Sequence, residues 1–261
     1  MDNERALLEG IAKAGDATMA YFQQNHLKVR HKNDDSPVTQ ADLAAQRILD
    51  DVLQGWGGLP CVAEESQNPA FEKRQQWSRY WLVDPLDGTR EFIHGYDSFT
   101  VNVALIDQHV PQWGCVYVPA QALFYYGERG KGAFRLIRGE QPQPITVAKS
   151  LADPLRVAVS RSHGSEALQG FLNELPHYET VVLGSSLKIC YVAEGKIDIY
   201  PRLAPTSEWD TAAAHCVLQA AGGEIIDTQG QPLRYNTKSS LLNPHFLAVG
   251  DASYNWLQYI N

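Results

Sequence analysis

The spacing of apolar residues changes several times along this chain, and each change marks a boundary between predicted helices, strands and loops. Apolar residues recur every three or four positions from Leu8 to Phe22, which predicts an amphipathic helix that ends near Gln24. Residues 31–37 are polar and predict a loop. The helical spacing returns after Thr39, and Asp42 three residues later completes a capping-box pattern. Taken alone, this pair indicates a helix cap rather than a catalytic site.

The middle of the chain carries short apolar runs of strand length. Two of them end in acids, because residues 59–63 lead into Glu64 and residues 80–83 stop at Asp84. If these strands are neighbours that end at the same edge of a sheet, Glu64 lies beside Asp84. The glycines at 127–132 lack the spacing of a phosphate loop and indicate a hairpin turn. Further strands are predicted at 99–106, 113–118, 123–126 and 133–136.

A segment with three prolines, 141–154, separates this half from a second pattern in which strands and helices alternate. Such alternation is typical of an α/β fold. The segment is therefore the expected boundary between two lobes. Strands are predicted at 155–159, 180–183, 198–201, 224–226 and 246–249, and helices at 165–174, 188–194 and 210–221.

Composition narrows the possibilities for the whole chain of 261 residues. The formal net charge of −8 argues against a surface that coats nucleic acid, although metal ions can supply positive charge for a phosphorylated substrate. The charged N-terminus is not that of a signal peptide, and no apolar run reaches the ~18 residues that a membrane-spanning helix needs. The four cysteines form no C-x-x-C pair, which is typical of reduced thiols in a cytosol.

The segment from Asp84 to Gly88 is the first candidate for chemistry. An apolar strand ends there in an acid, a proline, a second acid and a glycine, and this tight turn can direct the carboxylates of Asp84 and Asp87 to one point. The carbonyl group of Leu86 can supply a third oxygen. Two ionised carboxylates that lie close together repel each other unless a cation neutralises them. Oxygen donors without Cys or His suit Mg²⁺, so the segment predicts half of a magnesium site.

The alanine-rich segment 209–223 is the second candidate. It predicts a helix that opens at Asp210 and ends at the glycine pair 222–223. The free N–H groups at a helix start suit both a capping aspartate and a nearby phosphate. Asp210 is therefore either a cap alone or part of a binding site, and the pattern does not decide between the two.

Three motifs, in this order, resemble the signatures of the inositol monophosphatase superfamily, whose members are Mg²⁺-dependent, lithium-sensitive phosphatases. They are residues 64–66 (EES), 81–89 (WLVDPLDGT) and 209–214 (WDTAAA), and the similarity covers nearly the whole chain. Ala214 stands where the last signature usually has glycine, so we expect a small packing adjustment there. The resemblance implies an α/β fold, an α+β layered sandwich of αβαβα order, in a single catalytic domain, 1–261. Its N-terminal lobe, 1–150, would bind metal, and its C-terminal lobe, 151–261, would bind substrate.

By this resemblance, two or more Mg²⁺ ions serve each active site. One would be held by Glu64, Asp84 and the carbonyl oxygen of Leu86. A second would be held by Asp84, Asp87 and Asp210, with Asp84 bridging the two ions. The resemblance thus assigns Asp210 to the metal site.

The same resemblance assigns catalysis to three further side chains. Thr89 and Asp42 resemble the pair that positions the attacking water and takes its proton, which changes the interpretation of Asp42 from cap to catalyst. Glu65 would orient water or hold a further, weaker ion. Hydrolysis would then proceed without a covalent intermediate.

Within the superfamily, the chain is most similar to the bisphosphate nucleotidases, through residues 87–93 (DGTREFI), 160–163 (SRSH) and 184–188 (GSSLK). This similarity implies hydrolysis of a small molecule, adenosine 3′,5′-bisphosphate, at its 3′-phosphate to give AMP and phosphate. Lys188 and Arg202 would bind the second phosphate, which lies away from the metals and needs cationic partners of its own. The implied substrate-binding residues are Glu64, Leu86, Asp87, Gly88, Thr89, His163, Ser185, Lys188, Arg202 and Asp210.

Two other interpretations stay open at this point. The first is a phosphatase for inositol or sugar phosphates, although Leu203 stands where the inositol branch places a glutamate for sugar hydroxyls. The second is a non-catalytic protein that senses a nucleotide or binds a partner, against which the intact acids argue. The resemblance implies a cytoplasmic enzyme of sulfur metabolism. The sequence leaves open the oligomeric state and a peripheral attachment to the inner face of the cell membrane.

Overall fold

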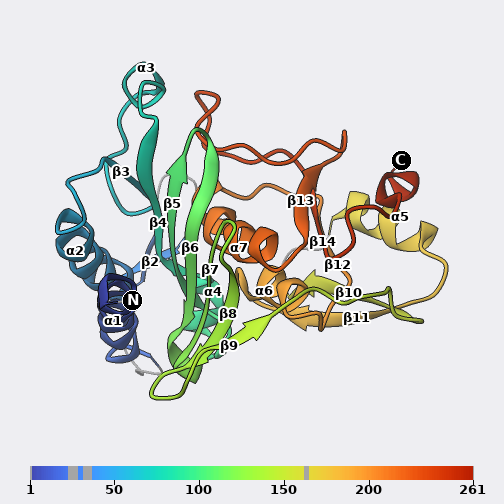
Figure 1. The fold of residues 1–261 in the computed structure, drawn as a ribbon, viewed down its shortest axis with the longest axis horizontal. Coiled ribbons are helices and arrows are strands. Elements are labelled where there is room, and N and C mark those ends of the chain that lie inside the picture. The colour runs from blue at the N-terminus through green and yellow to red at the C-terminus, as the bar shows by residue number, and fades with distance from the viewer. Residues whose placement is uncertain (1, 23–28, 32–36, 162–164, 261) are drawn as a thin grey trace.

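The structure is a computed structural model that describes residues 2–22, 29–31, 37–161 and 165–260. Its helices in chain order are α1 (Asp2–Met19), α2 (Gln40–Gln54), α3 (Phe71–Arg74), α4 (Thr89–Ile93), α5 (Glu166–Glu174), α6 (Leu187–Ala193) and α7 (Glu208–Ala220), with 3₁₀ turns η1 (Pro119–Gln121) and η2 (Trp256–Tyr259). Figure 1 shows alternating layers: α1 with α2, a seven-stranded sheet, α6 with α7, a five-stranded sheet, and α5. The predicted layered α/β class is confirmed.

The seven-stranded sheet follows the order of the chain. Its strands are β3 (Cys61–Ala63), β4 (Arg79–Asp87), β5 (Thr100–Asp107), β6 (Val110–Val118), β7 (Leu123–Glu128), β8 (Gly132–Ile137) and β9 (Gln143–Ile145). Neighbouring strands run antiparallel except β3 and β4, which are parallel and therefore end at the same edge. Only β9 was not predicted, because this short and largely exposed edge strand lies in the proline-containing segment 141–154 and shows no hydrophobic alternation.

The five-stranded sheet has the order β11-β10-β12-β14-β13. Its strands are β10 (Leu155–Ser160), β11 (Tyr178–Leu183), β12 (Ile199–Arg202), β13 (Glu224–Asp227) and β14 (Phe246–Val249). β10 runs parallel to β11 and β12, whereas β14 is antiparallel to β12 and β13. Each matches a predicted strand within two residues. A loop was predicted at 31–37, but its first and last residues belong to strands. These are β1 (Val29–His31) and β2 (Pro37–Thr39), which pair antiparallel. Residues 32–36 lie outside the described part.

Helix α7 lies close against the seven-stranded sheet because both surfaces carry small residues. Ala213 and Ala214 are buried, so the alanine at the position where glycine is usual is accommodated in the core. Gly114 of β6 leaves no room for a side chain, since a Cβ there would lie 2.4 Å from the Ala213 carbonyl oxygen and 2.8 Å from Cys216 Cβ. The tight packing expected of this alanine-rich helix is confirmed.

The first helix ends at Met19, five residues before the predicted end near Gln24. Beyond Met19, the N–H groups of residues 21 and 22 bond only three residues back, so the helix closes in tight turns. Phe22 still packs against Phe92 and Phe99, with ring centroids 5.4 Å and 5.0 Å apart. The apolar period therefore outlasts the helix because Phe22 remains in the core. Gln24 itself lies outside the described residues.

The chain changes sheets between Ile145 and Leu155, within the predicted boundary segment. Helix α7 follows that boundary in sequence and yet packs on the first sheet, so the division into lobes 1–150 and 151–261 stays a prediction. In the described part of the chain, no helix combines the length and the apolar character needed to cross a bilayer. All four cysteines are free thiols, as predicted.

Candidate metal and phosphate site

The parallel pair β3 and β4 brings the first two acids together. Ala63 pairs with Val83 in this register, and the N–H of Glu64 donates to the Val83 carbonyl oxygen at 3.2 Å. Glu64 therefore leaves β3 beside Asp84 of β4. The prediction that two neighbouring strands deliver these acids at one sheet edge is confirmed.

Strand β4 continues through the acidic motif instead of ending at Asp84, which corrects the predicted turn. The pairing with β5 shifts between Asp84 and Asp87, so the motif forms a bulge inside the strand. Pro85 lacks an N–H group, and the Leu86 N–H donates inward to Asp84 Oδ1 at 3.0 Å. The bulge ends at Gly88, whose φ of 88° is left-handed and leads into α4. The motif thus has the rigidity expected of a turn while it stays in the sheet.

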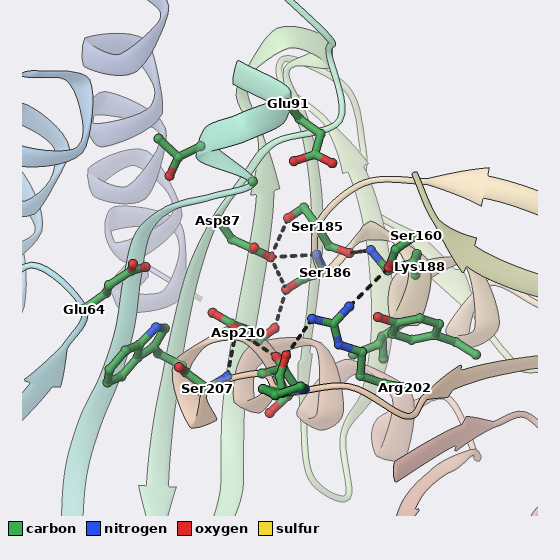
Figure 2. Close-up of a pocket in the computed structure, with 18 of the residues that line it drawn as sticks. Glu64, Asp87, Glu91, Ser160, Ser185, Ser186, Lys188, Arg202, Ser207 and Asp210 are labelled. Atoms are coloured by element: carbon green, nitrogen blue, oxygen red, sulfur yellow. Dashed lines mark hydrogen bonds between the residues drawn. The ribbon is translucent and has the colours of Figure 1, made fainter. Parts of the chain in front are cut away.

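Asp87 joins the edge of the first sheet to the loop that follows β11. Its Oδ2 atom accepts hydrogen bonds from Ser185 Oγ at 2.6 Å and from the Ser186 N–H at 2.8 Å, as Figure 2 shows. Ser185 has a φ of 53°, which is strained for a residue other than glycine. These bonds hold the strained residue against Asp87. They also fix the Asp87 carboxylate at the junction of the two sheets.

Asp210 occupies the third position of α7 and not its start. The helix begins at Glu208 after the N-cap Ser207, which corrects the predicted opening at Asp210. Asp210 Oδ2 accepts from the Ser207 N–H at 2.8 Å and from Thr206 Oγ1 at 2.7 Å, so it completes a capping box. Capping and metal binding are therefore compatible, because a carboxylate has two oxygens.

The donor set suits a divalent cation. Carboxylate oxygens of Glu64, Asp84 and Asp210 lie within 4.8 Å of one another. Asp84 is buried, and its Oδ2 atom has no hydrogen-bond partner among the described residues. A buried carboxylate oxygen without a donor is costly unless it is protonated or bound to a cation. An all-oxygen set of this kind fits Mg²⁺.

Burial and mutual repulsion perturb these carboxyls. Burial raises the pKa of Asp84 well above its ordinary value, and the charges of Glu64, Asp87 and Asp210 raise it further. Burial, with the charges of Asp87 and Glu64, raises the pKa of Asp210 to about 7. Without a cation, the cluster therefore holds protons that exposed carboxyls would have lost at neutral pH.

The metal-free protein should accordingly lose stability as the pH rises from about 4 to about 7. In this interval the folded chain binds more protons at Asp210 than the unfolded chain does, so the stabilising contribution of Asp210 is complete below about pH 4 and lost as the pH rises through about 7. The raised pKa of Asp84 acts in the same direction. Mg²⁺ binds the ionised form, so it should raise the melting temperature more at about pH 7.5 than at about pH 5. Thermal melts with Mg²⁺ or a chelator test this, and an equal shift at the two pH values would contradict it.

Asp42 both caps α2 and contacts Thr89. Its Oδ2 atom accepts from the Thr39 N–H at 2.8 Å and from Thr39 Oγ1 at 2.6 Å, which confirms the capping box. Its Oδ1 atom accepts a hydrogen bond from Thr89 Oγ1 at 3.2 Å. The same Thr89 hydroxyl lies 3.3 Å from the Leu86 carbonyl oxygen. The cap thus holds a buried carboxylate behind the Thr89 hydroxyl. Glu65 is half-buried after β3 and is not among the described residues that line the cavity, so its role stays a prediction.

A cavity of about 310 Å³ opens beside the acidic cluster. Glu64, Asp87 and Asp210 line one part of it, and the predicted phosphate ligands Lys188 and Arg202 line another (Figure 2). Lys188 is buried and donates from Nζ to the Ser185 carbonyl oxygen at 2.7 Å, with its ammonium group 5.1 Å from the Tyr200 ring centroid. Arg202 donates to Ser160 Oγ at 3.4 Å and to the Pro205 carbonyl oxygen at 2.7 Å.

The structure thus brings most of the predicted residues to one place. Gly88, Thr89 and Ser185 also line the cavity, while Asp84 is buried and clusters with two of the lining acids, Glu64 and Asp210. His163 lies outside the described residues, so its assignment stays a prediction.

Several residues of the site were not predicted. Ser186 and Thr206 hold the carboxylates of Asp87 and Asp210, and Glu91 and Tyr200 line the cavity. The S-x-x-D spacing of residues 207–210 was a usable capping signal that identifies the true helix start. The contact of Ser186 with Asp87 has no local signal, because it joins the N-cap of α6 to the end of β4, 99 positions apart in the chain.

The fold and the site together define the class of the protein. In this layered αβαβα sandwich, acids that follow β3 or lie in β4 and α7 meet at one point, and the model of the inositol monophosphatase family matches residues 4–255 of the chain. The chain is a member of this family.

Two curated relatives and a solved structure refine the comparison. The 3′(2′),5′-bisphosphate nucleotidase CysQ of Salmonella typhimurium is 47% identical over 238 residues, which are 89% of this chain and 94% of that protein. The protein of the same name from Haemophilus influenzae is 38% identical over 94% of this chain and 92% of its own length. The crystal structure of CysQ from Bacteroides thetaiotaomicron, a bacterial member of the inositol monophosphatase family, is 35% identical, with a TM-score of 0.83 and coverage of 95% of this chain and 97% of that chain.

Proposed function

We propose that this chain is a Mg²⁺-dependent phosphatase that hydrolyses the 3′-phosphate of adenosine 3′,5′-bisphosphate to give AMP and phosphate. The family is Mg²⁺-dependent, and curated relatives are named for 3′(2′),5′-bisphosphate nucleotidase activity. In the cell the reaction would remove a bisphosphate by-product of sulfur metabolism.

The observation that carries the proposal is the division of charge within a single cavity. One part is lined by Glu64, Asp87 and Asp210, and another by Lys188 and Arg202. Acids can hold one phosphate only through cations, whereas a lysine and an arginine can bind a second phosphate directly. A substrate with two phosphates held apart by a ribose matches this division.

The part of the cavity lined by Glu64, Asp87 and Asp210, here called the metal end, would hold two or more Mg²⁺ ions. We assign one to Glu64, Asp84 and the Leu86 carbonyl oxygen, and another to Asp84, Asp87 and Asp210. Support comes from the three clustered carboxylates and from the Asp84 Oδ2 atom, to which no described residue donates a hydrogen bond. When bound, Mg²⁺ supplies positive charge that stabilises the phosphoryl oxygens in the transition state.

Thr89 and Asp42 would orient the attacking water and accept its proton. In this arrangement Thr89 Oγ1 accepts a hydrogen bond from the water while its own proton is directed to Asp42 Oδ1, at 3.2 Å. The water oxygen bonds to phosphorus as the bond from phosphorus to the ribose 3′-oxygen breaks. The proton of the attacking water passes through Thr89 Oγ1 to Asp42, and the leaving 3′-oxygen takes up a proton from solvent water to become the hydroxyl group of AMP. The bonds from Thr39 keep the Asp42 carboxylate in place for this transfer.

The part of the cavity lined by Lys188 and Arg202, here called the cationic end, would bind the 5′-phosphate. A site for a second phosphate distinguishes a bisphosphate nucleotidase from the two alternative functions. An inositol phosphate needs acceptors for its hydroxyl groups, but Leu203 is apolar and packs in the core of the second sheet. A protein that only senses a nucleotide does not need the acidic cluster and the Asp42–Thr89 pair. The charges and contacts of the site therefore favour a nucleotide phosphatase.

Replacing Lys188 tests the substrate. Lys188→Met keeps the apolar stem but removes the charge, so kcat/KM for adenosine 3′,5′-bisphosphate should fall by about 10- to 100-fold, the value of one charged hydrogen bond. Adenosine 3′-monophosphate lacks the 5′-phosphate, so its kcat/KM should change little. Phosphate release from both substrates gives the ratio of kcat/KM for adenosine 3′,5′-bisphosphate to kcat/KM for adenosine 3′-monophosphate.

Lys196→Met is the matched control, because Lys196 is about half exposed and neither it nor its ion-pair partner Glu194 lines the cavity. It should leave both rates unchanged. A Lys188→Met enzyme that keeps the wild-type ratio between the two substrates would count against the bisphosphate as the substrate.

A further inference from the structure

Glu91 is a carboxylate of the cavity that the proposed mechanism does not use. It belongs to α4, two residues after Thr89, and Figure 2 shows its carboxylate pointing into the pocket on the side of Ser185. The residue is only 9% exposed. No described residue donates a side-chain or backbone hydrogen bond to its carboxylate, and no ion pair among the described residues includes it.

The position of Glu91 relative to the metal end follows from Gly88. A Cβ atom built on Gly88 would lie 3.4 Å from Glu91 Oε2 and 3.4 Å from Ser185 Cβ, so the carboxylate stands directly beside the Gly88 backbone. Gly88 connects Asp87, at the metal end, with Thr89, which would orient the water. A substituent next to the scissile phosphate therefore comes within reach of Glu91.

The chemistry of a carboxylate limits what this substituent can be. Glu91 faces the cavity, so a bound substrate displaces water from its carboxylate and gains if it supplies a hydrogen-bond donor in place of that water. A second phosphate at this position would be repelled by the like charge. In a 3′-phosphorylated ribonucleotide, the neighbour of the scissile phosphate is the 2′-hydroxyl, which is neutral and can donate.

We infer that Glu91 accepts a hydrogen bond from the hydroxyl next to the scissile phosphate, so that the site prefers ribonucleotide 3′,5′-bisphosphates to their 2′-deoxy forms. The inference rests on the proposed function and adds the recognition of the sugar to it. Glu91 is then a specificity-determining residue, and Lys188 and Arg202 recognise a different part of the same substrate.

The test compares adenosine 3′,5′-bisphosphate with 2′-deoxyadenosine 3′,5′-bisphosphate in wild type, Glu91→Met and Glu91→Gln. Wild type should prefer the ribonucleotide in kcat/KM by about 10- to 100-fold, the range for a hydrogen bond to a charged group. Glu91→Met keeps the length but has no oxygen acceptor, so its ratio should fall to near one. Glu91→Gln keeps a neutral acceptor, so its ratio should lie between those of wild type and Glu91→Met. If the methionine variant does not fold, the comparison of Glu91→Gln with wild type is the test.

Glu140→Gln is the control, since Glu140 is exposed in the turn after β8, and its ratio should equal that of wild type. A wild-type ratio near one, a ratio that survives in Glu91→Met, or an equal loss on both substrates would overturn the inference. A wild-type protein that releases phosphate from neither nucleotide would instead overturn the proposed function. Equal and rapid hydrolysis of both nucleotides by wild type would overturn the inference alone.

Discussion

Replacing Asp84 by asparagine should reduce Mg²⁺-dependent phosphate release by about a thousandfold or more, because a lost metal ligand removes several kcal/mol of charge stabilisation. The same change should make the metal-free protein more stable at neutral pH. Burial and three neighbouring carboxylates raise the pKa of Asp84 well above its ordinary value, so the ionised side chain destabilises the fold. Rates with Mg²⁺ and melting temperatures in a chelator measure the two effects.

The opposite signs of these effects separate a lost metal site from a damaged fold. An inactive Asp84→Asn protein that melts higher than wild type in chelator has lost chemistry and not structure. Asp51→Asn is the matched control, because Asp51 is exposed on α2, and neither quantity should change. An Asp84→Asn enzyme with more than about a tenth of wild-type activity would contradict the assignment of Asp84 to the metal site.

Breaking the contact between Asp42 and Thr89 should lower kcat by about 10²- to 10⁴-fold, the range for general acid–base catalysis. Asp42→Asn removes the proton acceptor, and Thr89→Val removes the hydroxyl that lies 3.2 Å from it. Because the two groups act as a unit, the double variant should be about as slow as the slower single variant. Steady-state kinetics of the three proteins with adenosine 3′,5′-bisphosphate test this.

Asp42 also caps α2, so Asp42→Asn can lose about 1 kcal/mol of stability for a reason unrelated to catalysis. Thr89→Val leaves that cap intact and therefore isolates the catalytic effect. Thr89→Ser retains the hydroxyl and should keep most of the activity. Full additivity in the double variant, or a Thr89→Val enzyme as fast as wild type, would argue against a shared proton path.

The acids of the site could be found in the sequence because each follows a local signal. Glu64 and Asp84 end apolar runs of strand length, and Asp210 lies in the first turn of an alanine-rich helix, so their placement is visible within a few residues. The assignment of Asp210 to the metal site came from the family resemblance. Pro85 shows the limit of this reasoning. It indicated a turn, but a proline also fits a bulge, and only the pairing with β5 distinguishes them.

The contacts that complete the site could not be predicted, because they join segments far apart in the chain. Ser185 bonds to Asp87 across 98 positions, from the turn after β11 to the end of β4, and β11 and β4 belong to different sheets. A single sequence carries no register between strands that do not pair, so it cannot show which loop faces the Asp87 carboxylate. The resemblance to a known family named Ser185 as a substrate ligand but gave no sign that its side chain also bonds to Asp87.

Phosphate release from adenosine 3′,5′-bisphosphate by the wild-type protein, with Mg²⁺ and with a chelator, tests the central claim most directly. Acids that follow β3 or lie in β4 and α7 converge beside the cavity, where we propose that they hold Mg²⁺, so we expect release with Mg²⁺ and none in the chelator. The rate should exceed that on inositol monophosphate. Release that persists without a divalent cation, or no release with one, would contradict the account.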